Sequence, residues 1–221
     1  MQNMKVQRVE PIRNQVAQLL RTAISDLQFK PGQVLVEREL CEMTGASRPS
    51  VREALRQLES EGLVTSKTGK GTVVSSMTPV EAAQVCQIRA VLEGLAGRLF
   101  TENATAEQRA ELVDVVNRFE AELDNPDRLM GIKNEFYRVL LEGSGNELAA
   151  QMTVTLQRRS SLLRATSLMV PGRPKQTVKE LRAILAAIKK NDADKVEQLC
   201  RDHVNNIYAA AIERLPDPVS G

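Results

Sequence analysis

The 221-residue sequence has few of the residues that metal sites and disulfide frameworks require. It contains one histidine, His203, and three cysteines, Cys41, Cys86 and Cys200, which lie far apart in the chain. It lacks paired metal-ligand spacings such as Cys-x-x-Cys or His-Glu-x-x-His, and it lacks the turn that presents a nucleophilic serine. No apolar run reaches the roughly 18 residues that span a bilayer, and residues 1–10 lack the apolar core of a signal peptide. These absences argue against an enzyme and a membrane protein, and they predict a cytoplasmic protein without disulfides.

The charge of the sequence is unevenly distributed. With 42% hydrophobic and 26% charged residues, the composition is typical of a globular protein, and the length allows two modest domains. Residues 1–76 carry 11 Lys and Arg against 8 Asp and Glu, a net of +3, whereas residues 77–221 carry 19 against 20, a net of −1. A polyanion is a reasonable partner for the first third of the chain, although a surface of mixed charge explains the same count.

Residue patterns in the first third predict a winged helix-turn-helix. The predicted elements are helices over residues 9–27, 37–43 and 47–61 and strands over residues 63–66 and 72–75. Gly45 is expected to end the second helix, and Ser47 can cap the third. Gly69 and Gly71 allow the positive φ angles of a tight turn between the strands.

The third predicted helix places two arginines outside its apolar seam. Arg48 and Arg52 are four residues apart and therefore share a face near the helix N-terminus. That end is electropositive because its backbone N–H groups are unpaired, and the major groove of DNA admits a helix. A guanidinium can bond a guanine edge or a phosphate through two parallel hydrogen bonds. We therefore predict DNA contacts from both arginines, with Ser47 and Pro49 beside them and Lys70 at the hairpin tip.

Four segments of this region resemble the DNA-binding domain of the GntR family of bacterial transcriptional regulators. They are VEREL at residues 36–40, SRPSVREALRQLE at 47–59, EGLV at 61–64 and GKGTVV at 69–74. The resemblance covers residues 8–75 at the spacing of the family. It implies that DNA is contacted by Arg38, Ser47, Arg48, Arg52 and Gly69. The alternative is a winged helix that serves protein contacts.

The rest of the sequence shows helix-start signals and no strand-like alternation. Thr78 and Thr105 each begin a capping box. The predicted helices span residues 79–100, 106–124, 126–143, 146–168, 175–190 and 192–214. We therefore predict a mainly α protein: an N-terminal winged helix-turn-helix domain (1–76), a C-terminal antiparallel six-helix bundle (77–214) and a tail (215–221).

Four of these helices place polar residues where their period predicts apolar ones. The residues are Arg89, Lys133, Tyr137, Arg159 and His203. Burying unpaired charges costs several kcal/mol each, so such a cluster requires acids, water or a bound anion. Glu93, one turn after Arg89, could neutralise it, and Lys133 and Arg159 could extend to the surface. A satisfied structural cluster and a binding site for a small anionic effector both fit this pattern.

The second part of the chain resembles the effector-binding FCD domain of the FadR-like branch of the family. The similar segments are IRAVLEGLA at residues 88–96, Phe136 with Gly145 and Asn146, residues 180–188 and RDHV at 201–204. The six predicted helices are similar to the VanR-type subgroup. Many members hold a divalent metal through one Asp and three His, and the resemblance places these ligands at Lys133, Tyr137, Leu181 and His203. One imidazole cannot hold a zinc-like ion, so we expect no metal and no cofactor. The Lys133 ammonium would then stand in for the metal charge and attract a carboxylate-like effector.

The two resemblances together imply a ligand-responsive transcriptional regulator, expected to be a repressor. Such winged domains bind pseudo-palindromic operator DNA as a homodimer, and the helical domain would hold the two copies together. An effector would shift the equilibrium between dimer geometries that fit both half-sites and those that do not. The rival interpretation is a helical small-molecule-binding protein or enzyme whose winged helix serves protein contacts.

Overall fold

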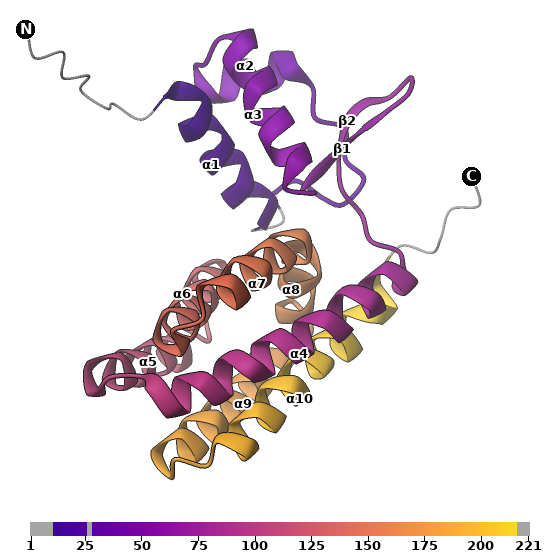
Figure 1. Ribbon diagram of the computed structural model, residues 1–221. Coiled ribbons are helices and arrows are strands. Elements are labelled where there is room, and N and C mark those ends of the chain that lie inside the picture. Colours follow the sequence, from indigo (N-terminus) through magenta and orange to yellow (C-terminus); the bar gives the residue numbers. More distant parts are fainter. Residues whose placement is uncertain (1–10, 26–27, 216–221) are drawn as a thin grey trace, which may run out of the picture. The chain divides into compact units, whose positions relative to one another are not determined.

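The computed structural model describes residues 11–25 and 28–215, which form two compact units that meet in the sequence between Ser75 and Ser76 (Figure 1). The predicted first-helix residues 9–10 and 26–27 and the tail from residue 216 lie outside the described residues. The protein is mainly helical, with a hairpin in the first unit, so the predicted fold class is confirmed. None of the described helices is long and apolar enough to cross a bilayer.

The first unit is a helix-turn-helix built on an apolar core. Its elements are α1 (Ile12–Ser25), α2 (Glu37–Thr44), α3 (Arg48–Ser60), β1 (Val64–Lys67) and β2 (Gly71–Val74). The core takes Val16, Leu20 and Ile24 from α1, and the predicted seam of α3 is buried. As predicted, α2 ends at Gly45, which has a φ of 68°, and the Ser47 hydroxyl caps α3 by accepting from the Ser50 N–H. These two residues set the tight turn that presents the first turn of α3.

The hairpin is the wing. β1 and β2 are antiparallel with Val64 opposite Val74, and Gly69 and Gly71 both have a φ of 77°, as predicted for the turn between them. The sequence patterns missed a third contributor, because Val34 bridges to Val73 along the free edge of β2. This bridge ties the segment before α2 to the wing.

The second unit is a helical bundle whose core lies mainly between α4, α5, α6, α9 and α10. Its elements are α4 (Pro79–Asn103), α5 (Ala106–Ala121), α6 (Pro126–Ser144), α7 (Glu147–Arg159), α8 (Ser161–Leu168), α9 (Arg173–Lys189), α10 (Ala193–Ala211) and the 3₁₀ helix η1 (Ile212–Arg214). Both predicted capping boxes are present, at Thr78 and Thr105. Among the described residues the unit thus has seven α-helices where the sequence predicted six.

The extra helix arises from a break at Ser160, which divides the helix predicted over residues 146–168 into α7 and α8. The Ser160 hydroxyl donates to the carbonyl of Leu156 (2.8 Å) and accepts from Nη1 of Arg89 (3.1 Å). Serine side chains that bond to nearby backbone compete with regular helix geometry, and here a buried arginine holds the competing conformation.

The predicted inward face of α7 is also wrong. The helical period of residues 146–168 predicts an apolar seam in which Leu148 and Met152 face inward, but these side chains are 68% and 49% exposed. The buried face of α7 instead consists of Ala149, Thr153 and Gln157. Because small and polar residues line the inner face, the usual rule that the largest apolar residues face inward selected the opposite side.

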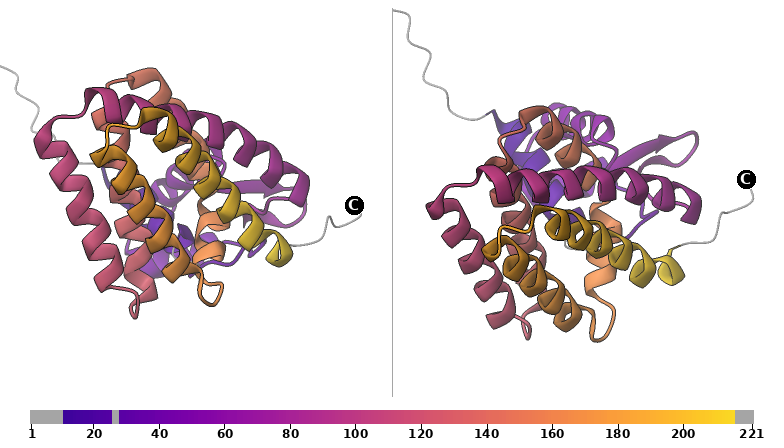
Figure 2. Two further views of the ribbon diagram at one scale, coloured as in Figure 1. Left: turned by 90° about the horizontal axis from the view of Figure 1, so that it is seen from below. Right: turned by 60° about the horizontal axis from the view of Figure 1, so that its bottom comes forward.

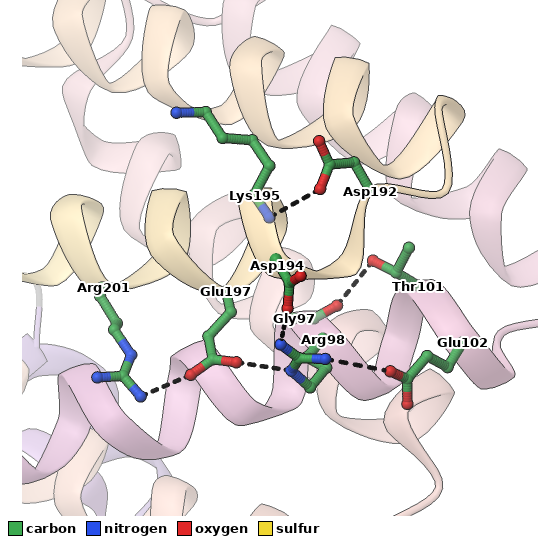
Figure 3. Close-up of polar contacts among 9 residues, drawn as sticks. All are labelled: Gly97, Arg98, Thr101, Glu102, Asp192, Asp194, Lys195, Glu197 and Arg201. Carbon is green, nitrogen blue, oxygen red and sulfur yellow. Dashed lines mark hydrogen bonds and ion pairs between the residues drawn. The ribbon is translucent and has the colours of Figure 1, made fainter.

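Helices α4 and α10 run side by side in opposite directions, as Figures 1 and 2 show. Two glycines of α4 permit the close approach: a Cβ on Gly97 would lie 2.7 Å from Sγ of Cys200, and one on Gly94 would lie 2.9 Å from Cγ of Arg201. Along the rim, Arg98 pairs with Glu102, Asp194 and Glu197 (Figure 3). Such exposed pairs add little stability, so the glycine contact is the main determinant of this spacing.

We expect Gly97→Ala to lower the free energy of unfolding by about 1–3 kcal/mol, because the added methyl overlaps the buried Cys200 sulfur and a methyl of Val196. Thermal unfolding followed by circular dichroism measures the change. Gly131→Ala on α6 is the matched control, since an added Cβ there meets no atom within 4 Å and alanine favours the helix. Equal stability of the two variants would contradict the close-packing argument.

Candidate functional sites

The residues predicted to contact DNA are all exposed on the first unit. The set is Arg38, Ser47, Arg48, Pro49, Arg52, Gly69 and Lys70. Arg48 is the first residue of α3 and Arg52 lies one turn later, while Gly69 and Lys70 form the tip of the wing. None of these side chains contributes to the core of the unit, so packing within the unit does not account for the choice of these residues.

Arg52 is held in place by a carboxylate of α2. Its Nε lies 2.8 and 2.9 Å from the two carboxylate oxygens of Glu37, to which it donates. This hydrogen bond lowers the pKa of Glu37, and the nearby Arg48 guanidinium lowers it further. Within the described residues Arg48 itself forms no ion pair. The first two turns of α3 therefore present one oriented and one free guanidinium, which is a suitable pair for a phosphate or a guanine edge.

The second candidate site is a group of buried polar side chains inside the second unit, here called the buried polar cluster. It draws residues from α4, α6, α8, α9 and α10. Its members are Arg89, Glu93, Lys133, Tyr137, Arg164, Arg173, Glu180 and His203. The predicted burial of Arg89, Lys133, Tyr137 and His203 is therefore correct.

Arg89 is neutralised within its own helix. Its Nε donates to Oε1 of Glu93 (3.0 Å), and Nη2 lies 2.9 Å from the same oxygen. Gln157 also donates to that oxygen (3.2 Å). Burial opposes the charge on both groups, yet each holds the other ionised: the pKa of Arg89 is raised and that of Glu93 is lowered. The pairing that the sequence offered as an alternative is thus present.

Arg173, Glu180 and His203 form a second neutralised group. Oε2 of Glu180 accepts from Nη2 of Arg173 (2.9 Å) and lies 2.5 Å from Nδ1 of His203. Although burial raises it, the pKa of Glu180 falls to about 2 because of these partners. Burial, with the Lys133 charge next in size, lowers the pKa of His203 to about 4. His203 is therefore neutral at pH 7 and donates from Nδ1, which leaves Nε2 as an acceptor.

Lys133 has no partner. Its side chain is 0% exposed and its Nζ makes no hydrogen bond in the described structure. Burial lowers its pKa well below the usual range, and the nearby positive charges of Arg164, Arg173 and Arg89 lower it further. The idea that this lysine extends to the surface is wrong, because the ammonium ends inside the bundle.

Arg164 has no carboxylate partner among the described residues either. Its Nη2 donates to the side-chain oxygen of Asn134 (2.9 Å), its guanidinium carbon lies 4.9 Å from the ring centre of Tyr137, and its Nε is unbonded. Burial lowers the pKa of Arg164 to about 10, which leaves the guanidinium charged at neutral pH. Burial, with the Glu93 charge next, raises the pKa of Tyr137, so this ring stays neutral.

The prediction that Arg159 faces this interior is wrong. The structure exposes Arg159 at the end of α7, where its charge lowers the pKa of Glu81 near the start of α4. Arg159 lies on the same outer face of α7 as Leu148 and Met152, whereas Arg164 of α8, beyond the break at Ser160, faces the interior. Arg173 was not predicted from the sequence, although the Pro at the next position and Thr177 and Glu180 on the same face of α9 are signals that point to it.

The positions at which the family resemblance places metal ligands do not suit a metal. Lys133 offers an ammonium, Leu181 is packed in the apolar core, and Tyr137 and His203 complete the set. Among the described residues no group of three His, Cys, Asp or Glu is arranged to hold a metal ion. The donor chemistry therefore does not fit the divalent metal that the resemblance implies.

Both units match known protein families. Residues 12–74 match the family described as bacterial regulatory proteins, gntR family, and residues 84–206 match the FCD domain. The chain is 27% identical over 230 residues to the HTH-type transcriptional repressor NanR of Salmonella newport, covering 90% of this chain and 84% of that protein. It is 24% identical over 200 residues to the HTH-type transcriptional repressor RspR of Escherichia coli, covering 90% and 88%. The structure of Escherichia coli McbR/YncC has a similar fold, with a TM-score of 0.82 at 20% identity and coverage of 93% of this chain and 99% of that chain.

Proposed function

We propose, because the chain belongs to the GntR family of bacterial regulatory proteins and carries an FCD domain, that it is a repressor that binds a pseudo-palindromic operator as a homodimer. Membership of the family makes it a helix-turn-helix transcriptional regulator and not an enzyme. In this proposal residues 1–76 read DNA in the cytoplasm, and residues 77–214 bind an effector and the second copy. The similarity to the repressors NanR and RspR supports repression over activation of transcription.

The observation that carries this proposal is the exposed pair Arg48 and Arg52 on the first turns of α3. Their guanidinium groups lie at the electropositive end of the helix that follows the tight turn, and one is already oriented by Glu37. Arg38, Ser47, Pro49, Gly69 and Lys70 complete the proposed DNA surface. The helix would read base edges while the wing meets the flanking backbone or the minor groove.

The proposed contact between the two copies uses exposed apolar residues on α4 and α7. Ile88 and Val91 on α4 are about half exposed, and Leu148 and Met152 lie exposed on α7, which packs against α4. Scattered surface apolar residues need no explanation, but two neighbouring helices that both expose them favour a covered face. The described residues of the second unit form seven α-helices, so the six-helix count behind the VanR-type assignment has no support from them.

The proposed effector is a small carboxylate-like anion held by the buried polar cluster. Arg89, Lys133, Tyr137 and His203 remain in the proposed site, whereas the exposed Arg159 does not. Effector binding would favour one dimer geometry over another and thereby change the affinity for an operator with two half-sites.

We expect Arg48→Ala to weaken operator binding by about 1–3 kcal/mol, roughly 5–150-fold, if the side chain reads a base edge. An operator can be selected from a random 40-base-pair library, and fluorescence anisotropy of the full chain then measures affinity for operator and scrambled duplexes. Lys189→Ala, which removes one positive charge from the second unit, is the control and should change affinity little.

Two further arms of this experiment test the dimer and the specificity. A duplex with one half-site should bind much more weakly than the full operator. Affinity should fall steeply with salt, because bound phosphates release counterions. Equal affinity for operator and scrambled DNA would contradict the proposal.

A further inference from the structure

The buried polar cluster contains more positive than negative charge. Its four cations are Arg89, Lys133, Arg164 and Arg173, and its two carboxylates are Glu93 and Glu180. Tyr137 and His203 are neutral at pH 7. Four positive charges against two negative ones leave a surplus of two when Lys133 is protonated.

The surplus can be assigned to particular atoms. Glu93 faces Arg89, and Glu180 faces Arg173, so each of these carboxylates is already committed. The other oxygen of Glu180 accepts from Nδ2 of Asn206 (2.9 Å), which completes its bonding. Within the part of the chain that the structure describes, Lys133 and Arg164 are therefore the two cations of the cluster without a carboxylate partner, and both are at least 98% buried.

These two groups also keep free hydrogen-bond donors. Nζ of Lys133 and Nε of Arg164 have no partner in the described structure, and Nε of Arg173 is a third buried donor without one. Native structures satisfy the great majority of buried donors, and a concentration of unbonded ones on charged groups indicates a missing acceptor. The acceptor that suits these cationic donors is an anion. Because the donor set does not suit a metal ion, this anion would bind directly to the side chains and not through a metal.

We propose that the buried polar cluster is a metal-independent receptor for a small dianion, with Lys133 and Arg164 as the groups that bind its two negative charges. The inference rests on the proposed effector role of this cluster and narrows it. The ligand is either a compound with two carboxylates or one with a single doubly charged tetrahedral group. Arg173 Nε supplies a further donor, whereas Nε2 of His203, being an acceptor, does not bind an anionic oxygen.

Thermal unfolding of the full chain with simple anions tests this receptor. Sulfate, phosphate and succinate would be compared with acetate and chloride at equal ionic strength in the presence of a chelator. Near ten times its dissociation constant, a bound dianion should raise Tm by about 4 °C, and the chelator should not reduce this shift. Succinate and the tetrahedral anions separate the two kinds of ligand. Absence of any Tm rise beyond that given by acetate and chloride would overturn the proposal.

Matched variants separate binding from the general stabilising effect of sulfate and phosphate on proteins. Lys133→Met and Arg164→Gln should each lose the dianion-specific Tm rise, whereas Lys179→Met, on the exposed side of α9, should keep it. Lys133→Met replaces an unpaired ammonium with an apolar chain of similar length, so it should fold and show a higher Tm without anions. A dianion-specific rise that persists in both cluster variants would also overturn the proposal.

The operator assay distinguishes failure of the receptor from failure of the regulator. Specific operator binding without any dianion-specific Tm rise would refute the receptor and leave the proposed DNA-binding function intact. A dianion-specific Tm rise that disappears in Lys133→Met, with no change in operator affinity on adding that anion, would support the receptor and refute its role as the effector site.

Discussion

Replacing Glu93 with glutamine is expected to lower the free energy of unfolding of the second unit by about 3–5 kcal/mol. The substitution keeps the shape of the side chain but removes the only carboxylate that faces Arg89 in the described structure. Arg89 is 0% exposed, so water cannot replace the lost charge. The remaining cluster would then hold Arg89 together with the already unpaired Lys133 and Arg164, and the mutual repulsion adds to the cost of burial.

Urea unfolding followed by circular dichroism measures this effect, because the second unit supplies most of the helix in the chain. The double variant Arg89→Met/Glu93→Leu is the informative control. Replacing a buried ion pair by apolar residues of similar volume is often neutral, so it should recover most of the loss seen in Glu93→Gln. If Glu93→Gln unfolds at the same urea concentration as the original protein, the pair is not electrostatically essential.

The parts of the fold that depend on local chemistry could be predicted from the sequence. Thr78 and Thr105 begin α4 and α5 because each hydroxyl accepts from the third helical N–H while a Glu or Gln returns the bond. Gly69 and Gly71 adopt the positive φ that a tight wing turn requires. These signals need only a few neighbouring residues, so no tertiary information was required to identify them.

The errors occurred where tertiary contacts override local preference. Ser160 is compatible with a helix interior, and only the buried Arg89 that donates to its hydroxyl explains why α7 ends there. The phase of α7 failed because Thr153 and Gln157 face inward while Leu148 and Met152 face outward. Arg164 and Arg173 enter the cluster from helices whose direction depends on that break. The sequence therefore predicted that the interior contains polar side chains, but it did not predict which cations and carboxylates are buried there.

Acidification from pH 7 to pH 4 is expected to destabilise the second unit through His203. Its pKa is about 4 in the folded protein and about 6.5 in an unfolded chain, so between these values the unfolded state binds more protons. Stability is therefore complete above about pH 6.5 and is lost as pH falls through 4. The shift corresponds to about 3 kcal/mol in full, of which about 2 kcal/mol should be lost by pH 5. The pKa of Glu180, about 2, adds a further loss only below about pH 4.5.

His203→Asn isolates this contribution, because an asparagine amide can still donate to Glu180 but does not titrate. Urea midpoints of both proteins at pH 7, 6 and 5 should diverge, with the original protein losing more stability at each step. The charged neighbours of His203 are Lys133, Arg173 and Glu180, and of these Lys133 also has a pKa that burial lowers well below its usual range. Repeating the comparison in the Lys133→Met background removes that second titration. Parallel loss of stability in the histidine and asparagine proteins in this background would show that folding does not shift the pKa of His203, and hence that the attraction of Glu180 fully offsets the effect of burial.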